Sequence, residues 1–325
     1  MFLTRLRQLK PAERRWLRAG LLVTVVGLAV WGLASQWTQV QEALDQLDGW
    51  DVAGSGVCVL AGLGCMMLAW RTLLADLGSE LTVPAATRVL FLGQLGKYVP
   101  GAVWAVAAQV ELARDYDVPR RRSVTASLTG MATTLVAGLV VAGLTLPLTS
   151  SGAAREYWWV LAITPLAIAC LHPRVIKFFL DLALRMARRE RLEKAISLAG
   201  MGRALSWTFL GWGFYGLHAW LLISQFARGS GPHVLALSFG AYALAWTVGF
   251  LVIFFPSGIG PREAALIAVL SPVMPAASAL VVALASRMVM TIGDLLWAGA
   301  GLCVRRRPVV TVSAEVPKFE HEPGT

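Results

Sequence analysis

The segment FFPSGIGPREAAL occupies residues 254–266 and separates two apolar runs, each long enough to enter a lipid bilayer. Two prolines and two glycines fall between positions 256 and 261. A helix cannot continue through such a segment, because proline lacks the backbone N–H and clashes with the preceding turn, while glycine adds backbone freedom. We therefore predict a helix break within the membrane, where protein or a water-filled cavity must satisfy the freed backbone groups.

Charged residues follow this break directly. Arg262 and Glu263 begin the next apolar helix, and ionisable residues inside a membrane are candidates for function. The N-terminus of a helix also presents unpaired N–H groups and a partial positive charge, which suit a phosphate or another anion. We therefore predict a substrate-binding site at this tip. Its predicted residues are Gly258, Gly260, Arg262 and Glu263.

The composition indicates a polytopic membrane protein. Of the 325 residues, 57% are hydrophobic and 15% are charged, so a soluble domain could not bury the apolar surface. The formal net charge of +10 would suggest nucleic acid in a soluble protein, but here the Lys and Arg gather in loops, as in cytoplasmic loops of membrane proteins. The four cysteines lie in or beside apolar runs without a C-x-x-C pair. We expect neither nucleic-acid binding nor a metal or other cofactor.

The predicted fold is all-α, with a single integral membrane domain over residues 1–325. We divide it into two repeats of spans and re-entrant hairpins, each hairpin being a broken helix that enters and leaves on one side. The first repeat, 1–150, holds spans 19–36 and 52–74, a hairpin at 84–113 and a span at 124–148. The second, 151–304, holds spans 157–171 and 204–226, a hairpin at 234–274 and a span at 276–304, before a cytoplasmic tail at 305–325.

Loop charge supports this arrangement. The loop after the first span is acidic and has no Lys or Arg, whereas basic clusters occur at 114–122, 172–203 and 305–307. All basic clusters and both termini fall on the cytoplasmic side of the plasma membrane only if residues 84–113 and 234–274 are hairpins. The stretch 172–203 is either an amphipathic helix on the inner leaflet or a solvated basic loop.

The first predicted hairpin carries a second break, QLGKYVPG, at residues 94–101. It resembles the later break in combining an aromatic residue, a proline and a glycine before an Ala-rich helix. The order of spans and hairpin occurs twice in opposite orientation, which is the inverted-repeat pattern of transporters whose broken helices meet near the midplane. The predicted site residues here are Lys97, Tyr98, Pro100 and Gly101.

The last span contributes two further charges, Arg287 and Asp294. They lie seven residues apart, hence on one helix face and about 10 Å apart along its axis. Either they are buried as paired charges that fix packing, or they line a translocation path. Glu263 is expected to neutralise Arg262 or Arg287 when no substrate is bound. Gln109 is a weaker candidate for the site.

Two segments resemble the membrane domain of the lysylphosphatidylglycerol synthetase/flippase family, including related proteins that consist of that domain alone. They are GKYVPG at 96–101, with Arg114 and Val118-Pro119 downstream, and GIGPREAA at 258–265, followed by Arg287. The resemblance implies inverted repeats with re-entrant helices and movement of a lipid head group between leaflets. Bifunctional members add a membrane block and a cytoplasmic aminoacyl-transferase domain; we expect neither here, and therefore no lipid aminoacylation and no enzyme.

Three functions follow from these patterns. The first is a flippase that moves a phospholipid or lipid-linked head group. The alternative is a non-transporting scaffold or accessory subunit, as a homo-oligomer or with envelope-biosynthesis enzymes. A third is an intramembrane sugar transferase that uses Asp115 and Asp117 as metal ligands, although this D-x-D segment is more typical of a loop at a helix end.

Overall fold

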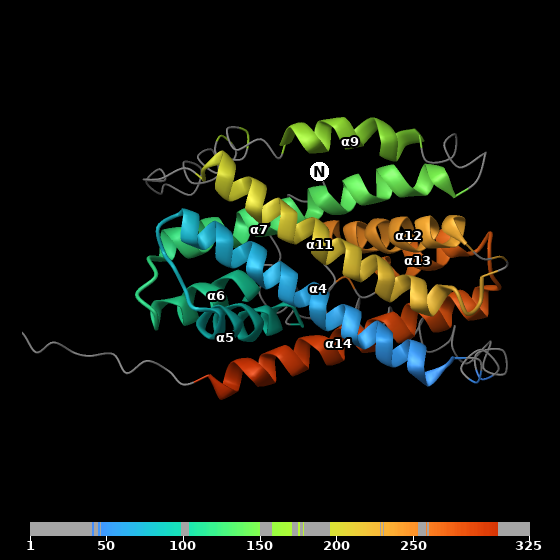
Figure 1. The fold of residues 1–325 in the computed structure, drawn as a ribbon, viewed down its shortest axis with the longest axis horizontal. Helices are drawn as coiled ribbons and strands as arrows, with labels where there is room; N and C mark the ends of the chain where they lie inside the picture. The colour runs from blue at the N-terminus through green and yellow to red at the C-terminus, as the bar shows by residue number, and fades with distance from the viewer. Residues whose placement is uncertain are drawn as a thin grey trace, which may run out of the picture.

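The computed structural model describes residues 41, 45, 47–98, 104–149, 158–170, 175, 178, 196–227, 229, 231–252, 258 and 260–304. These residues form helices and no strand (Figure 1), so the all-α prediction is confirmed. The elements are α4 (Gly49–Asp76), α5 (Val83–Gln94), η1 (Leu95–Tyr98), α6 (Trp104–Arg114), α7 (Arg120–Thr145), η2 (Leu146–Leu148), α9 (Trp158–Cys170), α11 (Leu198–Ile223), α12 (Pro232–Leu251), α13 (Pro261–Leu270) and α14 (Ala276–Cys303).

Four of these helical segments are long and apolar enough to cross a membrane: α4, α7 with η2, α12 and α14. The protein is therefore a multi-pass membrane protein, as predicted. Helix α9 has 13 residues, or about 20 Å, and is shorter than the hydrocarbon core of about 30 Å. The predicted span 19–36, the tail 305–325 and most of the basic stretch 172–203 lie outside the described residues.

Helix α11 begins at Leu198 rather than at residue 204, where the sequence prediction placed it. Ser197 caps this helix, because its hydroxyl accepts a hydrogen bond from the Gly200 N–H at 2.9 Å. The carboxylate of Asp76, at the end of α4, accepts the Ser197 N–H at 2.6 Å and so fixes the cap. Arg203 consequently lies on the helix and not in the preceding loop.

The core forms where α4 and α11 cross, next to α7 and α12 (Figure 1). A side chain at Gly62 of α4 would place its Cβ 2.5 Å from the ring of Tyr215 on α11, so the crossing needs glycine there. Trp212 and Tyr242 are among the largest fully buried side chains. Glycine at position 62 therefore permits the close approach of α4 and α11.

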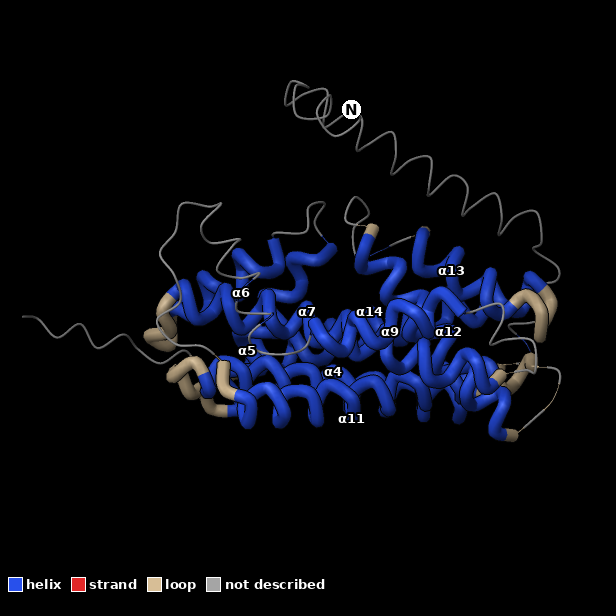
Figure 2. The backbone as a smooth tube through the Cα atoms, turned by 90° about the horizontal axis from the view of Figure 1, so that it is seen from above, coloured by secondary structure: helices blue, strands red, loops and turns tan. Residues whose placement is uncertain are grey.

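Two pairs of consecutive helices fold back on themselves, α5–η1 with α6 and α12 with α13. In each pair a glycine permits the two helices to approach closely. A Cβ at Gly96 would lie 2.7 Å from the Ala105 nitrogen, and one at Gly249 would lie 2.8 Å from the Arg262 Cβ. The two pairs occupy opposite halves of the molecule, as Figures 1 and 2 show. Helix α14 contacts both pairs, through α5 and through α13.

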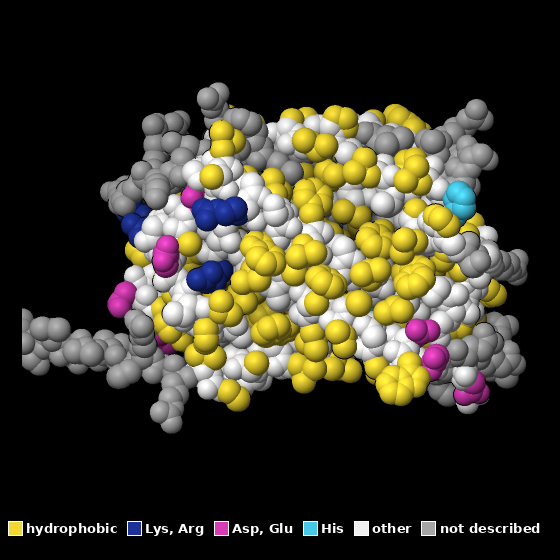
Figure 3. Space-filling model, in the orientation of Figure 1, with side chains coloured by type: hydrophobic (Ala, Val, Ile, Leu, Met, Phe, Trp, Pro, Cys, Tyr) yellow, Lys and Arg dark blue, Asp and Glu magenta, His cyan; other side chains and the backbone are white. Residues whose placement is uncertain are grey.

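The surface agrees with a membrane environment. Figure 3 shows hydrophobic side chains spread over the middle of one face, with charged side chains toward the two ends. On this face the Lys and Arg side chains lie toward the end that holds α5 and α6. Large apolar residues such as Leu217 and Leu296 are exposed on the long helices, as expected for helices that contact lipid.

Candidate functional site

Two glycines precede α13, and the carboxylate of Glu263 caps the start of this helix. Gly258 and Gly260 have φ angles of +69° and +95°, a left-handed conformation that residues with a Cβ rarely adopt. Pro261 follows in the first turn, where its missing N–H costs no helical hydrogen bond. The Gly260 N–H donates to Oε2 of Glu263 at 2.7 Å, which fixes this carboxylate in the first turn of the helix.

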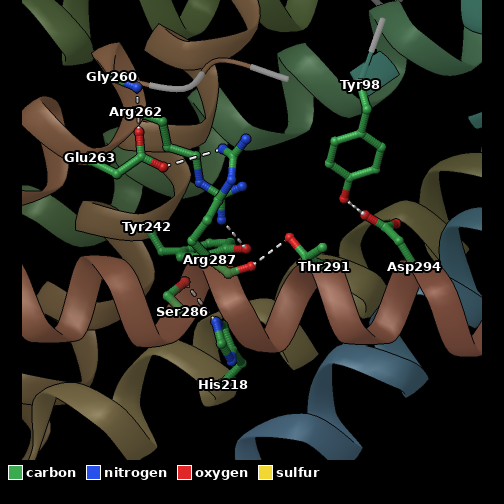
Figure 4. Close-up of polar contacts among 10 residues, drawn as sticks. All are labelled: Tyr98, His218, Tyr242, Gly260, Arg262, Glu263, Ser286, Arg287, Thr291 and Asp294. Carbon is green, nitrogen blue, oxygen red and sulfur yellow. Dashed lines mark hydrogen bonds and ion pairs between the residues drawn. The ribbon is translucent and has the colours of Figure 1, made fainter. Parts of the chain in front are cut away.

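Glu263 uses its other oxygen to reach α14. The Nη1 of Arg287 lies 3.2 Å from Glu263 Oε1, and the two side chains are 17% and 16% exposed. The prediction that Glu263 neutralises Arg262 or Arg287 is therefore resolved in favour of Arg287. This ion pair joins the second helix pair to α14 (Figure 4).

Arg262 has a different environment. The residue is 9% exposed and lies against Gly249 of α12, where no side chain intervenes. Its Nη2 donates to the phenolic oxygen of Tyr242 at 2.7 Å, and its guanidinium carbon lies 4.9 Å from the centre of that ring. Among the described residues, Arg262 forms no ion pair with a carboxylate.

The second helix pair contributes a carboxylate, that of Glu263, to its ion pair with α14, whereas the first contributes a cation. The Nζ of Lys97, on η1, lies 2.6 Å from Oδ2 of Asp294. The hydroxyl of Tyr98 donates to the same oxygen at 2.7 Å. Asp294 has a side chain that is 4% exposed, and its Oδ1 has no hydrogen-bond partner within the described part of the chain.

Helix α14 therefore connects the tips of both helix pairs. Arg287 and Asp294 stand on one face of α14, with Thr291 between them, and Figure 4 shows these side chains on the side of α14 where Tyr98, Arg262 and Glu263 lie. The sequence predicted this shared face but left the partners open. Each of the two charges pairs with a different helix pair, and they do not pair with each other.

A buried network beneath this site was missed from the sequence. His218 of α11 is fully buried, with Nδ1 2.6 Å from the Ser55 hydroxyl and Nε2 2.9 Å from the Ser286 hydroxyl. Its ring also lies edge-on to Tyr242, with centroids 5.4 Å apart. These polar residues sit inside regular apolar helices. Of these residues, only Tyr242 could have been identified from the sequence, by assuming that α13 folds back on α12 and so places Arg262 against it.

Other predicted residues lie elsewhere. Gln109 accepts a hydrogen bond from the Ser127 hydroxyl at 2.6 Å. Glu111 pairs with Arg114 at 2.9 Å on the surface. Pro100 and Gly101 lie outside the described residues.

The D-x-D segment forms a turn. Residues 115–117 connect α6 to α7, and Asp117 has a φ of +57°, as is common for aspartate at a helix end. No cluster of three or more His, Cys, Asp or Glu side chains suited to a metal occurs in the part of the chain that the structure describes. All four cysteines are free.

Comparison with known protein families gives a match over most of the chain. The family described as "Lysylphosphatidylglycerol synthase TM region" matches residues 17–298, which include both helix pairs and most of α14. The matched range holds all five charged residues described above: Lys97, Arg262, Glu263, Arg287 and Asp294. The functionally curated proteins yield no match to the sequence. On the basis of the match over most of its length, the chain belongs to the lysylphosphatidylglycerol synthase transmembrane-region family.

Proposed function

We propose that the protein is a flippase that moves a phospholipid or lipid-linked head group between leaflets, without a catalytic step of its own. The observation that carries the proposal is the cluster of five ionisable side chains where the tips of both helix pairs meet α14. They are Lys97, Arg262, Glu263, Arg287 and Asp294. Charges at such a position in a membrane protein are costly and are typical of substrate pathways.

The proposal includes a topology. Both helix pairs are re-entrant hairpins of an inverted repeat, in the plasma membrane, with both termini cytoplasmic. Two observations support it: each pair packs on itself, and the pairs occupy opposite halves of the molecule (Figures 1 and 2). Helix α12 alone has 20 residues and is long enough to cross, so accessibility from each side of the membrane is the deciding test.

The mechanism follows from the ion pairs. Lys97–Asp294 and Glu263–Arg287 hold the tips on α14 when no head group is bound. A head group that engages Arg262 competes with these contacts and permits one repeat to rock against the other, as in transporters built from inverted repeats. The family supports a lipid as the substrate, because its description names a lipid synthase region.

A scaffold is the second candidate, and it also has an observation in its favour. Two of the three cations already have carboxylate partners, so the charges can order the helix bundle without any ligand. In this case the protein would assist envelope-biosynthesis enzymes or form a homo-oligomer.

Reconstitution separates the two candidates. The purified chain is placed in vesicles with a fluorescent phospholipid in one leaflet, and movement is followed by quenching from outside. We expect movement in the native protein and a loss of at least about tenfold in Arg262→Ala, since a hydrogen bond to a charged group contributes about 1.5–3 kcal/mol. Arg203→Ala, which removes an exposed arginine of α11, is the matched control and should keep the native rate. Absence of movement in the native protein, at the level of empty vesicles, would favour the scaffold, whereas an equal, nonzero rate in Arg262→Ala would exclude Arg262 from the pathway.

A further inference from the structure

One neutral side chain fixes the position of Arg262. Within the described residues, the hydrogen-bond acceptor of Arg262 is the hydroxyl of Tyr242, which lies 2.7 Å from Nη2. The guanidinium carbon also lies 4.9 Å from the centre of the Tyr242 ring, whose negative face attracts a cation. Tyr242 is 1% exposed, so close packing holds its ring in place. Arg262 therefore rests on a fixed partner that leaves its positive charge uncompensated.

A carboxylate stands next to Arg262 in the sequence. A guanidinium binds a carboxylate, such as that of Glu263, more strongly than it binds a neutral oxygen. Both oxygens of Glu263 are occupied, one by the Gly260 N–H at 2.7 Å and the other by Arg287 at 3.2 Å. An Arg262 side chain released from Tyr242 would compete with Arg287 for this carboxylate, whose side chain is partly exposed. The contact with Tyr242 prevents this competition.

Tyr242 is in turn held by a buried histidine. The ring of His218 meets the Tyr242 ring edge-on, with centroids 5.4 Å apart and planes at 80°, a favourable arrangement for two aromatic rings. Two hydroxyls fix the imidazole, that of Ser55 on α4 at 2.6 Å and that of Ser286 on α14 at 2.9 Å. A neutral imidazole has one donor and one acceptor nitrogen, and a hydroxyl can serve either. Figure 4 shows the Ser286–His218 and Tyr242–Arg262 contacts.

We propose that Tyr242 is a positioning residue that holds Arg262 away from Glu263 and ready for the head group, and that His218 orients Tyr242. Through these contacts, α4, α11 and α14 determine where a side chain of α13 lies. The inference rests on the proposed function in one respect, that Arg262 engages the transported head group. The placement of Arg262 can be tested without transport.

Chemical modification measures this placement. The full chain in detergent is treated with phenylglyoxal, which reacts with accessible guanidinium groups, and modification of each arginine is measured by mass spectrometry. Exposed Arg203 is the internal standard. Tyr242→Phe keeps the ring and removes the hydroxyl, and should raise modification of Arg262 relative to Arg203 about tenfold, the range for one hydrogen bond to a charged group. Unchanged modification of Arg262 in this variant would overturn the proposal.

A matched control separates this effect from general loosening of the helix. Ser238 lies on α12, as Tyr242 does, and its buried hydroxyl donates to the Val234 carbonyl at 2.7 Å. Ser238→Ala should leave modification of Arg262 at the native level. A rise as large as that in Tyr242→Phe would show that any lost hydroxyl on α12 exposes Arg262, and would overturn a specific role for Tyr242.

Two variants test the contribution of His218. His218→Leu removes both hydrogen bonds to serine and should raise modification of Arg262 about threefold, the range for one aromatic contact. His218→Gln retains a donor and an acceptor for the two hydroxyls and should stay closer to the native level. Native modification in His218→Leu would overturn the role of His218. Equal rises in both variants would overturn the role of the serine hydrogen bonds.

Lipid movement in vesicles tests the link to function. Tyr242→Phe should move the fluorescent phospholipid about tenfold more slowly than the native protein, whereas Ser238→Ala should keep the native rate. Native movement in Tyr242→Phe, together with raised modification of Arg262, would overturn the positioning role. Absence of movement in the native protein would overturn the flippase instead, and the modification of Arg262 would still decide whether Tyr242 and His218 hold it.

Discussion

The two helix pairs meet the same helix with opposite charges. The first pair presents the cation Lys97 to the carboxylate Asp294, whereas the second presents the carboxylate Glu263 to the cation Arg287. The second pair also holds Arg262 on a neutral partner. The two pairs therefore differ in the charge that each contributes to its contact with α14. The first pair places its cation on a carboxylate of α14, whereas the second leaves Arg262 on a neutral phenol, and Arg262 is the cation that we propose for the head group.

The burial of the partners predicts an asymmetry within the first ion pair, and this is the largest effect we expect. Lys97 is 30% exposed and Asp294 is 4% exposed. Lys97→Ala leaves a buried carboxylate without its cation, which costs about 3–5 kcal/mol of the free energy of unfolding. Asp294→Ala leaves a lysine that reaches water, and should cost about 1 kcal/mol. Thermal unfolding in one detergent compares the two. A larger loss in Asp294→Ala would show that the lysine is the poorly solvated partner.

The second ion pair should behave symmetrically. Glu263 and Arg287 are similarly buried, at 16% and 17% exposure. Glu263→Ala and Arg287→Ala should therefore destabilise the protein to a similar extent, by about 3 kcal/mol each, because each removes one partner of the same ion pair. The double substitution Glu263→Ala with Arg287→Ala should lose less than the sum of the two single losses. Additive losses in the double variant would contradict a direct interaction.

Backbone geometry predicts a smaller difference between the two breaks. An added Cβ meets backbone at 2.8 Å at Gly258 and at 2.7 Å at Gly96, so both Gly→Ala variants suffer a similar clash. Only Gly258 has a positive φ, +69°, among these two positions. Gly258→Ala should therefore be less stable than Gly96→Ala by about 1–2 kcal/mol. Equal stabilities would mean that the second break adopts another backbone conformation in the membrane.

The smallest effect is expected outside the cluster. Glu111 and Arg114 form an ion pair with side chains 65% and 50% exposed. Glu111→Gln should change the free energy of unfolding by less than about 0.5 kcal/mol and leave lipid movement unchanged. Loss of movement in this variant would extend the pathway beyond the cluster to the end of α6.

Local chemistry in the sequence explains how much of this could be predicted. Two prolines and two glycines within six residues end a helix, so the break before α13 and its charged first turn were predictable at Pro261, Arg262 and Glu263. The partners were not, because they depend on folding at long range: the Tyr98–Asp294 hydrogen bond joins residues 196 positions apart. His218 gave no local signal, since a single polar residue in an apolar helix has no periodic pattern.

The central claim is that both helix pairs are re-entrant hairpins. The side of the membrane on which the two ends of each pair lie tests it most directly. The native cysteines are first replaced, and single cysteines are then introduced at exposed positions. Glu80→Cys and Arg120→Cys lie before and after the first helix pair. His233→Cys and Ser271→Cys lie at the start and end of the second. An impermeant thiol reagent applied to sealed cells and to inverted vesicles reports the side of each. We predict that residues 80 and 120 are labelled from the cytoplasm and residues 233 and 271 from outside. Labelling of the two members of either set from opposite sides would mean an uninterrupted crossing, and would contradict the account.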